Sequence, residues 1–109
     1  VKEDAPLILC LVRAGGFQIT SPVPDVPFPG LIISWTAVEG ATNYDLGVQD
    51  ITDPFQPPLA EDHLIQPFFD FTQKLGGDPT ISGHCYLIRV VAFGGNGPIA
   101  TTTGQACRQ

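Results

Sequence analysis

The apolar residues of this chain fall into short runs, and two of these runs alternate regularly with other positions. Between residues 43 and 49, Tyr44, Leu46 and Val48 alternate with polar residues and one glycine. Between residues 84 and 93, every second residue from Tyr86 to Ala92 is apolar. A period of two is typical of a β-strand with one buried face, and no stretch sustains the spacing of an amphipathic helix. The pattern predicts an all-β fold.

Glycine and proline clusters divide the rest of the chain into further strands. Residues 50–67 contain Asp53-Pro54 and Pro57-Pro58, which favour a loop with a short edge strand at 63–65. We find no internal repeat, and predict one domain over residues 17–109 preceded by an extension over residues 1–16. The remaining predicted strands cover residues 17–23, 31–36, 68–72 and 99–107, with turns at 39–42, 76–79 and 94–97.

The composition limits the possible partners. Charged residues make up 15% of the 109 residues, against about 25% in ordinary soluble domains, so we expect part of the surface to be covered by another molecule. A net charge of −6 argues against nucleic acids and anionic membranes as partners. No apolar run approaches the roughly 20 residues that span a bilayer.

The start of the chain and its cysteines predict an exported protein. The chain begins at Val1 and contains no Met, as expected of a mature chain after removal of a signal peptide; a fragment boundary is the alternative. Three cysteines are typical of an oxidising compartment, with one disulfide and one cysteine left over. We therefore expect a secreted or cell-surface location.

Two segments resemble fibronectin type III domains. The sequence Leu-Ile-Ile-Ser-Trp-Thr-Ala-Val-Glu-Gly-Ala-Thr-Asn-Tyr-Asp-Leu-Gly-Val, residues 31–48, is similar to the B–C hairpin of that family. Tyr86-x-Ile88-x-Val90-x-Ala92, followed by Gly-Gly-Asn-Gly, is similar to its F strand and F–G loop.

The resemblance covers residues 17–107 and implies an immunoglobulin-like antiparallel β-sandwich, to which the apolar run at residues 5–12 would add an extra N-terminal strand. The region 50–82 is longer than usual in the family, residues 1–16 precede its first strand, and no Arg-Gly-Asp supports an integrin role. The family implies that Trp35 and Tyr86 lie between the sheets. Together with the alternating strands, this gives the predicted core residues Trp35, Tyr44, Tyr86, Ile88 and Val90.

Candidate chemistry is sparse. His63 and His84 are the only histidines, and neither belongs to a nucleophile or metal motif, so we expect no enzyme activity, no metal and no cofactor. The acidic residues have no calcium-loop spacing, which favours a solvated acidic face over a cation site. These residues are Asp45, Asp50, Asp53, Glu61 and Asp62.

The cysteine positions predict one disulfide. If the last hairpin turns about Asn96, opposite residues have numbers that add to about 192, and Cys85 and Cys107 satisfy this condition. Directly opposite Cβ atoms lie close enough for a bridge at a non-hydrogen-bonded pair. Cys10 then stays unpaired, either as a small buried apolar residue or as a thiol near another subunit.

The N-terminal extension contains a strand that is apolar on both faces. Residues 5–12 have no polar side chain, and Gly15-Gly16 follow as a possible hinge. Such a strand is adhesive unless it is paired. It either folds back on its own sandwich or adds to the sheet of the next subunit, which would propagate into an open filament. The residues concerned are Leu7, Ile8, Leu9, Cys10, Leu11 and Val12.

Three functions follow from these features. We expect a structural subunit of an extracellular filament or surface assembly, a head-to-tail homopolymer joined by N-terminal strand donation. The alternative is a monomeric adhesion or spacer module of a larger cell-surface protein. A small-ligand or carbohydrate binder ranks last, because it needs exposed aromatic residues and Trp35 is expected in the core.

Overall fold

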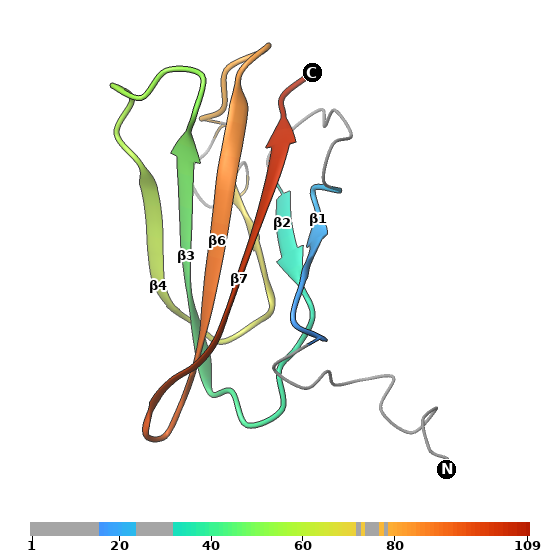
Figure 1. Cartoon of the computed structure of the whole chain (residues 1–109), viewed down its shortest axis with the longest axis vertical. Coiled ribbons are helices and arrows are strands. Elements are labelled where there is room, and N and C mark those ends of the chain that lie inside the picture. Colours follow the sequence, from blue (N-terminus) through green and yellow to red (C-terminus); the bar gives the residue numbers. More distant parts are fainter. Residues whose placement is uncertain (1–15, 24–31, 72, 74–76, 78) are drawn as a thin grey trace.

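The protein is a sandwich of two antiparallel β-sheets. A computed structural model describes residues 16–23, 32–71, 73, 77 and 79–109. One sheet has the strand order β1-β2-β5 and the other β4-β3-β6-β7, packed face to face (Figure 1). The predicted all-β sandwich is confirmed. The strands are β1 (Ile19–Ser21), β2 (Ile32–Trp35), β3 (Asn43–Asp50), β4 (Leu59–Leu64), β5 (Phe68–Asp70), β6 (Cys85–Gly94) and β7 (Gly97–Cys107).

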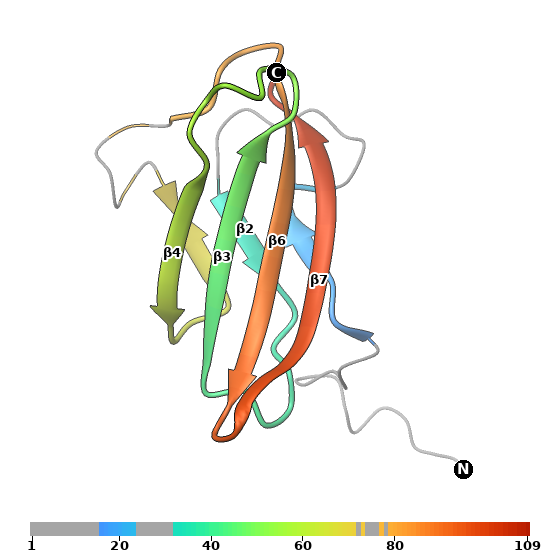
Figure 2. The same cartoon turned by 60° about the vertical axis from the view of Figure 1, so that its left-hand side comes forward.

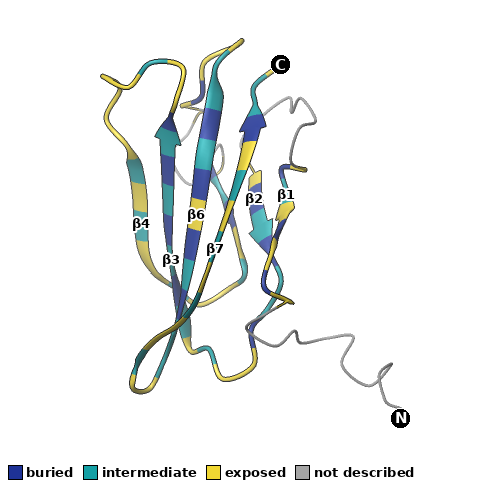
Figure 3. Ribbon diagram, in the orientation of Figure 1, coloured by how far each residue is buried: buried dark blue, intermediate teal, exposed yellow. Residues whose placement is uncertain are grey.

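The centre of the larger sheet is the β3–β6 pair, which stays in register from Asn43↔Phe93 to Asp50↔Tyr86. Along both strands buried residues alternate with less buried ones, as Figure 3 shows by colour. This alternation is the one the sequence predicts. It arises because successive side chains of a strand point to opposite faces, so one row enters the core and the other faces outward.

The core lies between the two sheets. Ile33, Trp35 and Phe69 contribute from the smaller sheet, and the Trp35 ring packs edge-on against Tyr44 at a centroid distance of 5.4 Å. All five core residues named from the sequence are buried: Trp35, Tyr44, Tyr86, Ile88 and Val90.

Two tyrosine hydroxyls tie loops to this core. The Tyr44 hydroxyl accepts a hydrogen bond from the Val38 N–H at 3.1 Å, in the turn between β2 and β3. The Tyr86 hydroxyl accepts one from the Ile81 N–H at 2.7 Å, just before β6. These bonds hold both connections close to the sandwich, and the bond from Val38 is buried, where an N–H without an acceptor would be costly.

Several strand boundaries differ from the predicted ones. β4 occupies residues 59–64, so the short strand predicted at 63–65 was wrong in extent. The pairing of β4 with β3 includes Leu59↔Val48, but the polar residues in the middle of β4 give no strand pattern in the sequence. β1 covers only residues 19–21 of the predicted 17–23. β5 ends at Asp70, although the next residue, Phe71, still buries its ring against Phe69.

The chain enters and leaves the sandwich at opposite ends. The residues leading into β1 are fastened beside the end of β2, where the Thr36 N–H donates to the Gln18 carbonyl at 3.0 Å. The C-terminus lies at the other end of the long axis (Figure 1). Within the described residues, no helix is long and apolar enough to cross a membrane.

Candidate functional site

The outer edge of β7 is the longest free strand edge in the described part of the chain. β7 has 11 residues and pairs with β6 from Cys85↔Cys107 to Gly94↔Gly97, while no described strand pairs with its other side (Figure 2). It carries no charged residue, and its one proline, Pro98, lies at its start. A long, uncharged edge is a template for pairing with another strand.

The other edges of the two sheets are protected. β4 contains Glu61 and Asp62, and its pairing with β3 is irregular near His63, whose φ is 58°. β1 and β5 have three residues each. Charge, irregular pairing and shortness are the usual ways in which proteins prevent strand addition at an edge. Strand addition is therefore best supported at β7.

The inner face of β7 is lined by small side chains. Its inward positions oppose the buried row of β6, from Tyr86↔Ala106 to Ala92↔Ala100. Ala106 is buried, but the other three inward residues are only partly buried because the sheet ends there. A further strand beside β7 would cover them and extend the core. The four inward residues are Ala100, Thr102, Gly104 and Ala106.

A disulfide fixes the end of this edge. Cys85 and Cys107 are register partners with sulfurs 2.02 Å apart, so the predicted bridge is confirmed. The Arg108 N–H donates to the His84 carbonyl at 2.8 Å. Hydrogen-bonded and non-hydrogen-bonded pairs alternate along an antiparallel ladder, so the cysteines occupy a non-hydrogen-bonded pair, where side chains come closer. The bridge thus locks the C-terminal end of β7 to β6.

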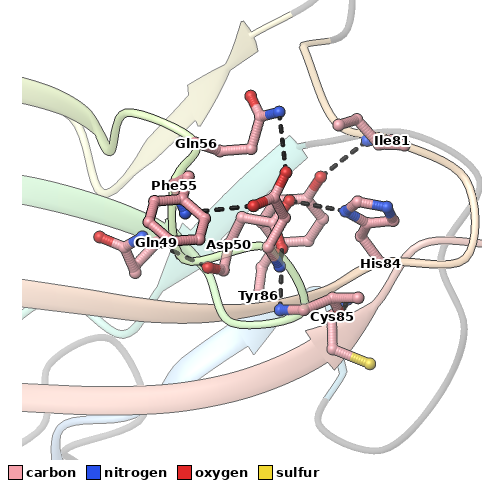
Figure 4. A network of polar contacts seen from close by, with 10 residues as sticks. Gln49, Asp50, Phe55, Gln56, Ile81, His84, Cys85 and Tyr86 are labelled. Carbon is pink, nitrogen blue, oxygen red and sulfur yellow. Dashed lines mark hydrogen bonds and ion pairs between the residues drawn. The ribbon is translucent and has the colours of Figure 1, made fainter.

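A buried carboxylate organises the loops at the same end of the sandwich (Figure 4). Asp50 is only 4% exposed, because it continues the inward row of β3 after Val48. Its Oδ1 accepts the N–H groups of Thr52 and Asp53, both at 2.9 Å, and its Oδ2 lies 2.7 Å from Nδ1 of His84. Asp50 therefore does not belong to the predicted solvated acidic face, which was wrong for this residue.

These contacts set the charge state of Asp50 and attach the β3–β4 loop to β6. Burial raises the pKa of the Asp50 carboxyl, but the hydrogen bonds from His84 and from the backbone outweigh burial and leave the pKa below its ordinary value. Beside this pair, the Thr52 hydroxyl accepts the Cys85 N–H at 2.8 Å. Oδ1 thus holds the β3–β4 loop in shape, and Oδ2 joins that loop to His84 just before β6.

An Asp50→Asn variant should show this contribution as a dependence of stability on pH. Because the pKa in the folded state lies below that of the unfolded state, the ionised carboxylate stabilises the fold above the unfolded pKa. The contribution is lost as the pH falls through the folded value. We expect the difference in unfolding free energy between wild type and variant to shrink below about pH 4. Urea unfolding at several pH values measures it, and a difference independent of pH would contradict this role.

The adjoining turn presents an aromatic side chain to solvent. The Gln56 N–H donates to the Asp53 carbonyl at 3.1 Å, and Asp53 Oδ1 accepts the Phe55 N–H at 3.1 Å. Pro54 occupies the second position of the turn, where its fixed φ is favoured. Phe55 is 93% exposed. Gln56, the last residue of this turn, borders a pocket of about 230 Å³, which is lined by Val48, Asp50, Gln56, Pro57, Leu59, Pro79, Ile81 and Tyr86.

Sequence reasoning missed Phe55 as an exposed aromatic residue, although Asp-Pro-Phe-Gln is a recognisable turn with an aromatic at its third position. The predicted assembly strand, Leu7 to Val12, and the first hinge residue, Gly15, lie outside the described residues. Gly16 is the first described residue and is exposed.

No protein-family model matches the chain, and no curated protein matches its sequence.

Proposed function

We propose that this protein is a non-catalytic structural subunit of an extracellular filament or surface assembly, joined by donation of residues 5–12 to the next subunit. One observation carries the proposal. Residues 17–109 already supply two sheets and a core, yet leave the 11-residue edge of β7 uncharged and unpaired among the described residues. The apolar segment 5–12, which the sequence predicts to form a strand, is thus not needed to complete the sandwich, and the edge of β7 is suited to pair with such a strand.

Two features support membership of the fibronectin type III class within this proposal. The strand order β1-β2-β5 and β4-β3-β6-β7 places Trp35 at the end of the second strand, facing Tyr44 of the third. The bond from the Ile81 N–H to the Tyr86 hydroxyl resembles the tyrosine corner of immunoglobulin-like sandwiches. The Cys85–Cys107 disulfide supports an oxidising, extracellular location.

The positions of the chain ends support head-to-tail assembly. The chain approaches β1 from the lower part of the molecule in Figure 1, and the C-terminus lies at the top. A strand donated from one end of each subunit to the next makes a heterologous contact. Contacts of this type propagate into an open filament instead of closing as a dimer.

Deletion of residues 1–14 tests the proposal. We expect the shortened chain to remain folded, because its core comes from residues 17–106, and to be monomeric at concentrations where the full chain assembles. Size-exclusion chromatography with light scattering measures the mass, and circular dichroism checks the fold. Deletion of residues 1–4 is the matched control, because it removes the polar start and leaves residues 5–12; it should assemble normally.

Two results would overturn the proposal. Unfolding of the chain that lacks residues 1–14 would show that the strand belongs to its own sandwich. A folded chain lacking these residues that still assembles like the full chain would show that residues 5–12 are not the joint.

The second candidate, a monomeric spacer or adhesion module, is favoured by the same opposite placement of the chain ends, which suits domains connected in tandem (Figure 1). The mass of the full chain separates the two. A monomer at every concentration supports the spacer, and a mass that grows with concentration supports the filament subunit.

A further inference from the structure

We propose that the acceptor for the donated strand is the outer edge of β7, and that its occupant is residues 5–12 of a second copy of this chain, with the row of Leu7, Leu9 and Leu11 facing inward. The inference rests on the proposed function and adds the location of the joint.

Length favours β7 over the other edges. Eight residues in extended conformation span about 26 Å, and an 11-residue strand offers about 36 Å, at roughly 3.3 Å per residue. β4 has six residues, and β1 and β5 have three each. Of the described edges, only β7 can pair with the whole apolar segment.

Charge favours the same edge. Residues 5–12 contain no polar side chain, and β7 contains no charged one. On β4 the same segment would bring apolar side chains beside Glu61 and Asp62, whose carboxylates would lose water without gaining a partner. An uncharged strand and an uncharged edge match each other without this cost.

Side-chain size explains which face of the donor would point inward. Ala100, Thr102 and Gly104 face the interior but remain partly exposed, so the margin of the core along β7 is lined by small groups. The row of three leucines can cover this margin with large apolar side chains. The alternate row of the donor contains Cys10, the smallest side chain of the six, and would lie on the outer face with Thr101 and Thr103.

The direction of the chain favours a second copy over the same copy. β1 and β7 run in the same direction, and the chain approaches β1 from the side of the molecule on which β7 begins (Figures 1 and 2). To pair with β7 of its own sandwich, the segment before β1 would have to reverse within residues 13–16. A neighbour stacked end to end beyond that end would receive the segment without any reversal.

Proline substitution at the outer edge tests the acceptor. The Arg108 N–H donates to the His84 carbonyl, and along an antiparallel pair every second N–H donates to the partner strand, so the even-numbered residues of β7 donate to β6. The N–H of the odd-numbered Thr103 therefore points away from β6. Thr103→Pro therefore removes an outward donor and no hydrogen bond of the β6–β7 ladder. We expect it to abolish the high-mass species seen with the full chain.

Ala60→Pro on β4 is the matched control. The Ile51 N–H donates to the Cys85 carbonyl, so the odd-numbered residues of β3 bond to β6 and the even-numbered ones to β4. Ala60 faces the odd-numbered Gly47, which places its N–H on the outer side of β4. This variant should assemble like wild type. Normal assembly of Thr103→Pro, or loss of assembly in Ala60→Pro alone, would overturn the choice of edge.

Hydrogen exchange of the unmodified chain gives a second test that does not depend on the folding of a variant. The N–H groups of Thr101, Thr103 and Gln105, which point away from β6, should become protected when the chain assembles, and the outward N–H of Ala60 should not, as measured residue by residue. Protection of the three β7 groups in the dilute monomer would show that the chain covers its own edge, and no protection on assembly would show that β7 is not the acceptor. Either result overturns the inference. The deletion of residues 1–14 tests the proposed function separately.

Discussion

Replacement of Trp35 by Ala is expected to lower the free energy of unfolding by about 3–5 kcal/mol, a large part of the stability of a domain of this size. Trp35 is 3% exposed and packs against Tyr44 between the two sheets. Truncation removes a large apolar group and leaves a cavity that the surrounding strands can fill only in part. Urea unfolding followed by circular dichroism measures the loss, because Trp35 is the only tryptophan and its fluorescence disappears in the variant.

Trp35→Phe is the matched control. The indole Nε1 is buried and has no hydrogen-bond acceptor among the described residues. Phenylalanine removes this unsatisfied N–H while keeping an aromatic ring, so we expect a loss of about 1–2 kcal/mol at most. If both variants lose the same small amount, or if native wild-type fluorescence has the emission maximum of a solvated indole, Trp35 is not the centre of the core.

Loss of the disulfide is expected to cost about 3 kcal/mol, the value that loop-closure entropy gives for a loop of this length. Cys85 and Cys107 are 22 positions apart in the sequence. Urea unfolding of the Cys85→Ser/Cys107→Ser double variant, compared with oxidised wild type, measures the effect. Wild type in the presence of reductant should behave like the double variant.

Peptide mapping without reduction provides the chemical control for this prediction. It should recover Cys85 and Cys107 in one linked fragment. Free thiols at both positions, or a bridge that includes Cys10, would contradict the pairing. Equal stability of the oxidised and reduced chains would contradict the expected energy.

The centre of the larger sheet could be predicted from the sequence because its strands are long and buried on one face. β3 alternates over its full length and β6 alternates from Cys85 to Ala92. The turn predicted about Asn96 was wrong by half a residue, because Gly94 pairs with Gly97, and a register shift between Ala92 and Phe93 then brings Cys85 opposite Cys107 as predicted. The same reasoning could not give β4. An edge strand buries little of its inner face, so Glu61, Asp62 and His63 carry no periodic signal.

The candidate sites were harder to predict because they depend on contacts between distant parts of the chain. The burial of Asp50 depends on His84, 34 residues away, and on two backbone N–H groups of its own loop. Phe55 is exposed because of where its turn lies on the sandwich, and the residues of the turn alone do not determine that position. The free edge of β7 becomes visible only when the order of all the strands is known.

Negative-stain electron microscopy of the purified, oxidised full chain tests most directly whether this protein is a filament subunit. Over a range of concentrations, we expect unbranched filaments one domain wide, since each subunit donates from one end and accepts along β7. The chain that lacks residues 1–14 should show none under the same conditions. Isolated particles of single-domain size at every concentration of the full chain would contradict strand donation and leave the spacer module as the better proposal.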